Sequence, residues 1–339
     1  MKKWIGIIVI LMLAAGALVY WLMNKEPEEA TPEQPPTEEP EVFVSPFSGE
    51  QAEEPFEARP VMAVINNHPD ARPQTGLVEA DIVFEFLAEG NVTRFLALYQ
   101  SKFPEEMGPI RSARDYFVEM AASYDAFFVA HGFSPDARSL LDSGEVDHIN
   151  GIFYDGTLFQ RSTDRVAPHN SYIMYDNVRA GMEQVEADAD FSGNSTYQFN
   201  EADERAKLEE QASRIEVRYG ANPQFYSVFT YDENTGQYNR ASGGEETKDK
   251  ESGEAVAVSN VLVLEATHDT IDAEGRLSID LESGGSALVF QNGGVMETQW
   301  SNLGGMLVPT NNGEAIELDP GKTWIHIVPS IGEMVDYTP

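Results

Sequence analysis

Residues 59–99 read RPVMAVINNHPDARPQTGLVEADIVFEFLAEGNVTRFLALY and hold three short apolar runs separated by polar and turn-forming residues. Runs of this length, rich in Val, Ile, Leu and Phe, are typical of β-strands. With a fourth run further along, the predicted strands cover residues 61–65, 82–86, 93–99 and 126–130. Apolar positions at helical spacing predict helices between and after them. These cover residues 112–124, with Ser112 as the cap, then 135–141 and 176–185.

The pattern of apolar and polar residues changes after about residue 210. Apolar and polar residues alternate with period two on both sides of the turn at 232–236, which predicts a β-hairpin. Further predicted strands cover residues 260–265, 277–281, 286–291 and 324–328. We therefore predict an α+β protein, in which an N-terminal α/β domain with a mixed sheet (58–205) precedes a mostly β C-terminal domain (206–339).

The N-terminus predicts a membrane anchor at residues 1–23. Lys2 and Lys3 precede twenty residues without a charge, from Trp4 to Met23. At about 1.5 Å per residue, a helix of this length spans roughly the 30 Å core of a bilayer. The lysines on one side and the glutamates after Lys25 predict a single pass with the rest of the chain outside the cytoplasm. A cleaved signal peptide, giving a secreted protein, is the alternative.

Residues 24–57 contain eleven glutamates, seven prolines and one lysine. Such a composition buries too little apolar surface to offset the entropy of ordering the chain. We predict an extended, disordered tether that separates the folded part from the membrane.

The composition of the whole chain excludes several classes of function. Asp and Glu total 57 against 22 Lys and Arg, which gives a net charge of −35. Nucleic acids are bound chiefly by neutralising their phosphates, so we expect no nucleic-acid partner. The chain has no cysteine, which excludes disulfides, thiolate metal sites, catalytic thiols and a lipid-modified cysteine.

Positive charge is concentrated in residues 59–170, where eight of the nine basic residues are arginine. Arginine is favoured where a planar fork must meet a carboxylate or a phosphate. This clustering predicts an anion-binding cleft. The predicted ligand-binding residues are Arg94, Arg111, Arg114, Arg161, Arg165, His169, Asn170, Glu85 and Glu89. The alternative is a purely structural network, in which the arginines pair with Glu85, Glu89, Asp115 and Asp164.

Several blocks of this sequence, in order, resemble the YerB-like family of bacterial envelope proteins. The blocks are 59–67 (RPVMAVINN), 71–77 (ARPQTGL), 89–95, 108–114 (GPIRSAR), 131–135, 167–170 (APHN), 260–263 and 321–324 (GKTW). The resemblance covers about residues 59–329. It implies a two-part domain of unknown function, with members linked to cell-wall synthesis enzymes.

This chain departs from the family in two respects. Typical members are lipoproteins anchored through a cysteine, which is missing here, so the run from Trp4 to Met23 would have to supply the anchor. Phe133 stands where the family usually has a glycine after His131 and Gly132, which changes the local shape of any pocket there. The family supplies no catalytic residues.

Catalysis is a second interpretation of the same region. Neither a Gly-x-Ser-x-Gly elbow nor a His-Glu-x-x-His motif is present. Ser112 or Ser134 could serve as a nucleophile with His131 or His169 as the base, because such arrangements are defined by geometry. Alternatively, the two histidines and a carboxylate such as Glu85 could hold a metal. Since an isolated histidine is more often structural, the sequence favours a protein without catalysis, metal or cofactor.

The sequence thus favours a membrane-anchored, extracytoplasmic protein of the bacterial envelope. It would bind peptidoglycan or another anionic wall polymer through the arginine cluster, or regulate wall synthesis. A hydrolase or transferase acting on wall material is one alternative. An adaptor that binds a membrane-bound cell-wall synthase is the other.

Overall fold

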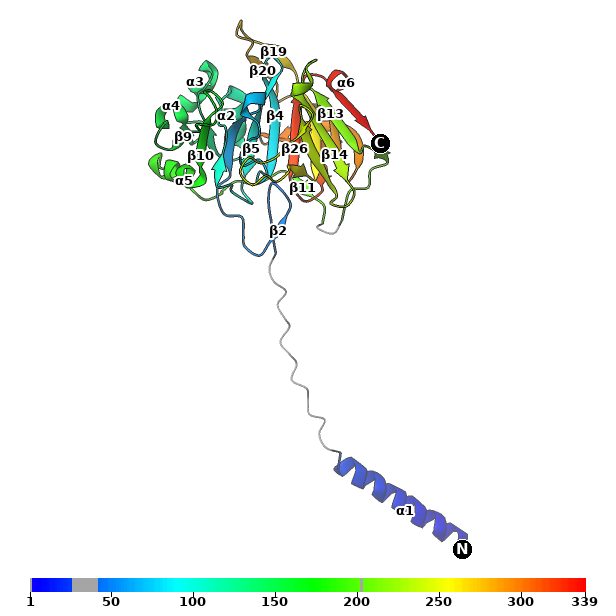
Figure 1. Ribbon diagram of the computed structural model, residues 1–339. Coiled ribbons are helices and arrows are strands. Elements are labelled where there is room, and N and C mark those ends of the chain that lie inside the picture. The colour runs from blue at the N-terminus through cyan, green and yellow to red at the C-terminus, as the bar shows by residue number, and fades with distance from the viewer. Residues whose placement is uncertain (1, 26–41, 202–203) are drawn as a thin grey trace. The chain divides into compact units, whose positions relative to one another are not determined.

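The computed structural model of the protein describes residues 2–25, 42–201 and 204–339. Helix α1 (Lys2–Met23) covers the predicted apolar segment, and residues 42–339 form a separate compact unit (Figure 1). Within the described residues, no helix combines the length and the hydropathy needed to cross a membrane. The single-pass anchor stays a prediction.

The second part of the predicted tether is folded. Strands β1 (Phe43–Val44) and β2 (Gln51–Ala52) form an antiparallel hairpin, and Phe47 in its turn is fully buried against Tyr124, with ring centroids 5.8 Å apart. The prediction of a tether as far as residue 57 is thus wrong from residue 42 onward, because one aromatic side chain docks this hairpin on the core. Residues 26–41 lie outside the described residues.

The compact unit is built around a twelve-stranded mixed sheet (Figure 1). Its order is β24-β23-β22-β21-β18-β26-β4-β5-β3-β7-β8, and β12 pairs with β22. The strands are β3 (Val61–Asn66), β4 (Ile82–Glu89), β5 (Val92–Tyr99), β7 (Phe127–Ala130), β8 (His148–Asn150), β12 (Glu210–Gln211), β18 (Asn260–Glu265), β21 (Gly285–Gln291), β22 (Gly294–Leu303), β23 (Met306–Asn311), β24 (Glu314–Ala315) and β26 (Thr323–Val328).

The two halves of the chain share this sheet. Strand β26 pairs in parallel with β4, so that Trp324 lies opposite Val83 and His326 opposite Glu85. The predicted domain boundary at 205/206 therefore falls inside one compact unit, although the elements on each side of it differ in type as expected. The mixed α+β class is confirmed.

A second, six-stranded sheet and several small elements complete the unit. The second sheet contains β13 (Arg214–Arg218), β14 (Tyr226–Asp232), β15 (Gln237–Ser242), β16 (Glu245–Glu246), β17 (Ala257–Val258) and β27 (Val335–Thr338). The smaller sheets contain β6 (Glu106–Met107), β9 (Phe159–Arg161), β10 (Ser171–Met174), β11 (Gln198–Phe199), β25 (Glu317–Leu318), β19 (His268–Thr270) and β20 (Leu277–Ile279). The remaining helices are η1 (Pro69–Ala71), α2 (Asp115–Ser123), α3 (Pro135–Ser143), α4 (Gly151–Tyr154), α5 (Tyr175–Gln184), η2 (Pro223–Phe225) and α6 (Ile331–Met334).

The large sheet is covered on both faces, which explains why its central strands are continuous apolar runs. In β3 every residue is buried, and alternate side chains enter different cores. Met62 and Val64 pack in the core that includes α2 and α3. Val61 and Ala63 pack in the core that includes α5 and the six-stranded sheet.

One predicted helix boundary is wrong. Helix α2 begins at Asp115, with Arg114 as its extended cap, and not at Ser112. The residues before it remain extended because Ala113 forms a bridge with Phe133, which competes with helix formation. This extended segment runs antiparallel to the last residues of β3, with Ile110 opposite Ile65 and the Arg111 N–H donating to Val64 O.

Candidate functional site

Polar side chains gather at the carboxyl ends of three neighbouring strands. Strands β3, β7 and β8 are parallel, and ligands of α/β proteins commonly bind beyond such strand ends. Asn66 ends β3, His131 follows β7, and Asn150 ends β8. We call the following residues the strand-end cluster: Asn66, His68, Arg111, His131 and His169.

Arg111 is the cation at the centre of the strand-end cluster. Its backbone is fixed on both sides, because its N–H donates to Val64 O (2.8 Å) and its carbonyl accepts from the N–H of His131 (2.9 Å). Its half-buried guanidinium makes no hydrogen bond or ion pair within the described residues. Burial and then repulsion from Arg94 lower the pKa of Arg111 to about 10, so it remains a cation at neutral pH. An uncompensated arginine of this kind attracts an anion.

His169 presents a donor beside this cation. Asn66 Oδ1 accepts from the N–H of His68 (2.9 Å), so its Nδ2 points to His169 Nδ1 at 2.8 Å and donates to it. Nδ1 is then an acceptor, and the ring proton lies on Nε2. Burial, His68 and Arg111 lower the pKa of His169, which keeps the ring neutral. His169 also stacks on His68, with centroids 4.6 Å apart.

His131 is held differently and has no free ring nitrogen. Arg161 Nη2 donates to Nε2 at 2.9 Å, so Nδ1 carries the proton and donates to Ser171 Oγ at 2.7 Å. Burial and then Arg161 lower the pKa of His131. A Cβ atom at Gly151 would overlap the His131 ring, which explains the glycine there. Both ring nitrogens of this histidine are therefore hydrogen-bonded within the protein, so the ring lines the site and is not available as a base.

The two candidate serine nucleophiles are occupied elsewhere. Ser112 Oγ donates to the backbone carbonyl of His131 (3.2 Å), and Ser134 Oγ accepts from the N–H of Ala137 (3.2 Å) as the cap of α3. Within the described residues, neither hydroxyl is hydrogen-bonded to a histidine ring. The arrangement is suited to binding an anion, since it offers donors and no activated nucleophile.

Two of the predicted arginines share one carboxylate. Arg94 Nη2 donates to both oxygens of Glu89, at 3.0 and 2.8 Å, and Arg114 forms an ion pair with the same carboxylate. Both arginines are buried and Glu89 is partly exposed. This part of the predicted ligand-binding set is therefore a compensated ion-pair network, which agrees with the structural alternative.

The arginines of the loop 161–170 also have hydrogen-bond partners within the protein. Arg161 forms a forked pair with Asp155 (2.9–3.1 Å) and donates to Asn170 Oδ1 at 3.2 Å. Arg165 donates to Tyr172 OH (2.6 Å) and to two backbone carbonyls of residues 71 and 73. These contacts shape the loop that carries His169, so the two arginines position the site. Asp164, the other suggested partner, pairs instead with Lys250.

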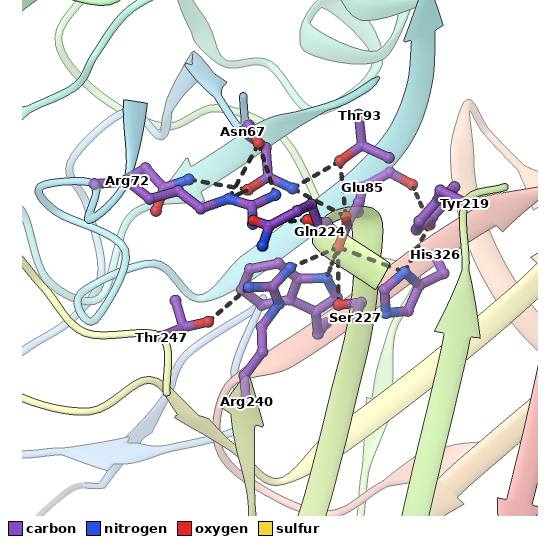
Figure 2. A network of polar contacts seen from close by, with 12 residues as sticks. Asn67, Arg72, Glu85, Thr93, Tyr219, Gln224, Ser227, Arg240, Thr247 and His326 are labelled. Carbon is purple, nitrogen blue, oxygen red and sulfur yellow. Dashed lines mark hydrogen bonds and ion pairs between the residues drawn. The ribbon is translucent and has the colours of Figure 1, made fainter. Parts of the chain in front are cut away.

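Glu85 does not belong to the cleft in which the sequence placed it. It lies between the two sheets, is 1% exposed, and forms an ion pair with Arg240 at 3.1 Å. Figure 2 shows the surrounding polar side chains converging on its carboxylate. We call the following residues the intersheet network: Asn67, Glu85, Thr93, Tyr219, Ser227, Arg240, Trp324 and His326. Its members come from both halves of the chain.

Each oxygen of Glu85 accepts several hydrogen bonds. Oε1 accepts from Asn67 (3.2 Å) and Thr93 (2.8 Å), while Oε2 accepts from Trp324 Nε1 at 3.0 Å and from Ser227 at 3.3 Å. Burial alone would raise the pKa of Glu85, but Arg240 and these donors outweigh burial and lower it. The carboxylate is therefore charged and fully coordinated.

Arg240 is enclosed as completely as its partner. Its guanidinium lies over the Trp324 ring at 4.3 Å and donates to Thr247 Oγ1 at 2.8 Å. His326 shares a 2.7 Å hydrogen bond with Tyr219, and burial followed by repulsion from Arg240 lowers its pKa to about 4. Arg240, Trp324 and His326 were not among the predicted site residues, because nothing local in the sequence distinguishes them from ordinary strand residues.

The suggested metal site is not assembled as expected. Glu85 is sealed between the sheets, whereas His131 and His169 lie at the strand ends. Among the described residues, the three groups close enough to share an ion are His68, Asp70 and His169, with ligand atoms within 4.8 Å. The Nδ1 atoms of both histidines already accept hydrogen bonds, from Asp70 N and from Asn66. A metal would have to compete with these contacts.

Fold and site together define a two-sheet α+β protein with a cationic site at the ends of parallel strands. The chain belongs to the DUF3048 family. Residues 47–188 match the family described as "Protein of unknown function (DUF3048) N-terminal domain" and residues 215–325 match its C-terminal domain. The resemblance inferred from the sequence blocks is thus confirmed.

One relative covers almost the whole chain. The "Putative lipoprotein YerB" of Bacillus subtilis (strain 168) is 42% identical over 98% of this chain and 97% of its own length. The crystal structure of the YerB protein from Bacillus subtilis matches with a TM-score of 0.80 and covers 87% of this chain and 99% of that one. The two-part layout is therefore common to both proteins.

Proposed function

We propose that this protein is a membrane-attached, extracytoplasmic component of the bacterial envelope that binds an anionic group of a wall polymer at Arg111. The observation that carries the proposal is the half-buried Arg111 guanidinium, which has no hydrogen-bond or ion-pair partner within the described residues. In a chain of net charge −35, such a group is unexpected unless it receives a ligand.

The neighbouring groups support an anion with several oxygens. The His169 Nε2–H is a neutral donor near Arg111, and the paired Arg161 closes one side of the site through His131. A carboxylate of peptidoglycan or a phosphate of a wall polymer has the required charge and acceptors. The attachment is inferred from the lipoprotein relative and, for this cysteine-free chain, from the apolar run between Trp4 and Met23.

Thermal unfolding of the full chain in detergent, with phosphate replacing chloride at constant ionic strength, tests the proposal. A ligand that binds only the native state stabilises it by about 2.7 kcal/mol at a hundredfold excess over Kd. We expect phosphate, and soluble wall fragments bearing carboxylates, to raise Tm in the parent and in Arg138→Ala. Arg138 is exposed, lies over the Phe133 ring, and within the described residues forms its one ion pair with Asp142, so it controls for the loss of one positive charge. Equal shifts in Arg111→Ala would refute the assignment.

The two alternative functions, an enzyme and an adaptor, predict different experimental results. A hydrolase or transferase would release soluble products from purified wall, although within the described residues the candidate serines are not bonded to a histidine ring. An adaptor for a membrane-bound synthase would co-purify with that enzyme whether or not Arg111 is present. Retention on insoluble wall that depends on Arg111, without release of products, distinguishes the proposed function from both.

A further inference from the structure

A cavity of about 340 Å³ opens between η1, η2 and the turn between β15 and β16. The residues of its lining that matter here are Arg72, Gln74, Gln224, Arg240, Glu245 and Thr247. It shares none of its lining with the strand-end cluster. The volume lies at the lower end of the roughly 300–1,000 Å³ range of ligand pockets, which suits a molecule of amino-acid or dipeptide size.

Arg72 supplies a positive charge without a counterion to this cavity. Its Nε and Nη2 donate to Asn67, and its Nη1 donates to the carbonyl of Gln224 at 2.9 Å. All these acceptors are neutral, and no carboxylate lies within ion-pair distance of Arg72 in the described part of the chain. Because a guanidinium has five N–H donors, one N–H on each terminal nitrogen of Arg72 has no partner in the described part of the chain.

The floor of the cavity contains a buried ion pair. Arg240 repels Arg72 and the carboxylate of Glu85 attracts it, but Glu85 forms its ion pair with Arg240 at 3.1 Å. The Arg240 Nε–H is buried and has no hydrogen-bond partner among the described residues. Figure 2 shows Arg72, Gln224, Arg240 and Thr247 around this region. Burial and repulsion from Arg240 lower the pKa of Arg72 to about 10, which leaves it protonated at neutral pH.

The wall of the cavity carries a negative charge as well. Glu246 forms an ion pair with Lys248 at 2.9 Å, whereas Glu245 has no cation within ion-pair distance in the described ranges. Arg72 and Glu245 thus line one cavity as an unpaired cation and an unpaired anion. A ligand whose own charges are separated in the same way would satisfy both.

We propose that this cavity binds a zwitterion, namely a free amino acid or a short peptide. Arg72 receives the α-carboxylate through its two remaining N–H groups, and Glu245 receives the ammonium group. Gln74 and Thr247 offer additional polar contacts along the wall. This site is distinct from the anion site at Arg111, and it would make the protein responsive to amino acids or peptides outside the cell.

Calorimetric titration of the full chain in detergent with alanyl-alanine, in both the L,L and D,D forms, tests this proposal. We expect one stereoisomer to bind, and its affinity to fall at least tenfold when the ammonium is acetylated or the carboxylate is amidated. Arg72→Gln and Glu245→Gln should each reduce the affinity of the free dipeptide at least tenfold. Arg138→Gln, on the exposed face of α3, should not change it.

Further outcomes separate the cavity from the strand-end cluster. Arg111→Ala should leave dipeptide binding unchanged, so a failure of the anion-site proposal does not affect this one. If Arg72→Gln fails to fold, the exposed Glu245→Gln variant still decides the matter. Equal affinity for the free and the blocked dipeptides, or no binding of either stereoisomer or of free alanine at millimolar concentration, would overturn the proposal.

Discussion

The strand-end cluster and the intersheet network both combine arginine with histidine, yet they differ in what surrounds the charge. Arg240 is 1% exposed and has a carboxylate at 3.1 Å and an aromatic ring beneath it. Arg111 is half-buried and has no such partner within the described residues. Burial of a charge is tolerated only when the charge is paired and hydrogen-bonded, so the first arrangement is structural.

This difference teaches how to separate a structural arginine from one that is available to a ligand. Clustering in the sequence does not distinguish the two kinds of arginine. Arg111 and Arg114 are three residues apart, yet their side chains have different surroundings. Arg114 is paired with Glu89, whereas Arg111 forms no ion pair with any acidic side chain of the described residues. If the two regions differ in this way, substitutions in them should change the free energy of unfolding by different amounts.

The largest effect is expected from Glu85→Gln, which removes the charge but keeps the shape of the side chain. The change leaves Arg240 as an uncompensated buried cation, and breaking a buried pair from one side costs about 3–5 kcal/mol. We expect the free energy of unfolding, measured by urea denaturation, to fall by that amount.

The matched control is Asp142→Asn, which breaks the exposed pair with Arg138. Exposed pairs contribute only about 0–1 kcal/mol, so the control should remain close to the parent. Similar losses in the two variants would mean that the intersheet network is no more important for stability than a surface ion pair.

The second prediction concerns how the free energy of unfolding depends on pH, and it tests the contribution of His326. Its pKa is about 4 in the folded chain, against 6.5 for the unperturbed residue, because burial and Arg240 disfavour the charged ring. Between these values the unfolded state binds a proton that the folded state does not. Stability should therefore fall as the pH drops from about 6.5 toward 4, by about 3 kcal/mol in total.

Comparison with His326→Asn removes the contribution of every other titrating group. The difference in unfolding free energy between parent and variant should shrink as the pH falls through this window and become constant below it. A difference that is independent of pH would show that His326 titrates alike in the folded and the unfolded chain.

The elements of the fold could largely be predicted, because they depend on local patterns. The apolar run at 61–65 and the helical pattern at 135–141 correspond to β3 and α3 within two residues. The pairing of β26 with β4 could not be predicted, since it joins residues some 240 positions apart and leaves no local trace. The hairpin around Phe47 was missed because its short strands lie among glutamates and prolines.

The candidate site could be proposed from residue type and local clustering alone. Arg111 and His169 were chosen in this way from two separate clusters, and in the structure Arg111 is close enough to affect the pKa of His169. Glu85 was assigned to the wrong place, because its partner Arg240 lies in the other half of the chain. Whether an arginine has an ion-pair partner depends on acidic residues that are distant in the sequence. Such contacts cannot be inferred from a single sequence.

The smallest effect on stability is expected from Arg111→Ala, and it completes the comparison. Within the described residues the guanidinium contributes no hydrogen bond or ion pair, and its removal relieves repulsion with Arg94. We therefore expect the unfolding free energy to change by no more than about 0.5 kcal/mol, as at an ordinary surface position. Arg94→Ala is the instructive control, because Arg94 is 4% exposed and its loss would break the bidentate pair with Glu89. Urea denaturation of both variants decides the question. If Arg111→Ala destabilises the protein as much as Arg94→Ala does, the guanidinium is a structural group, and the strand-end cluster is an ion-pair network of the same kind as the one between the sheets.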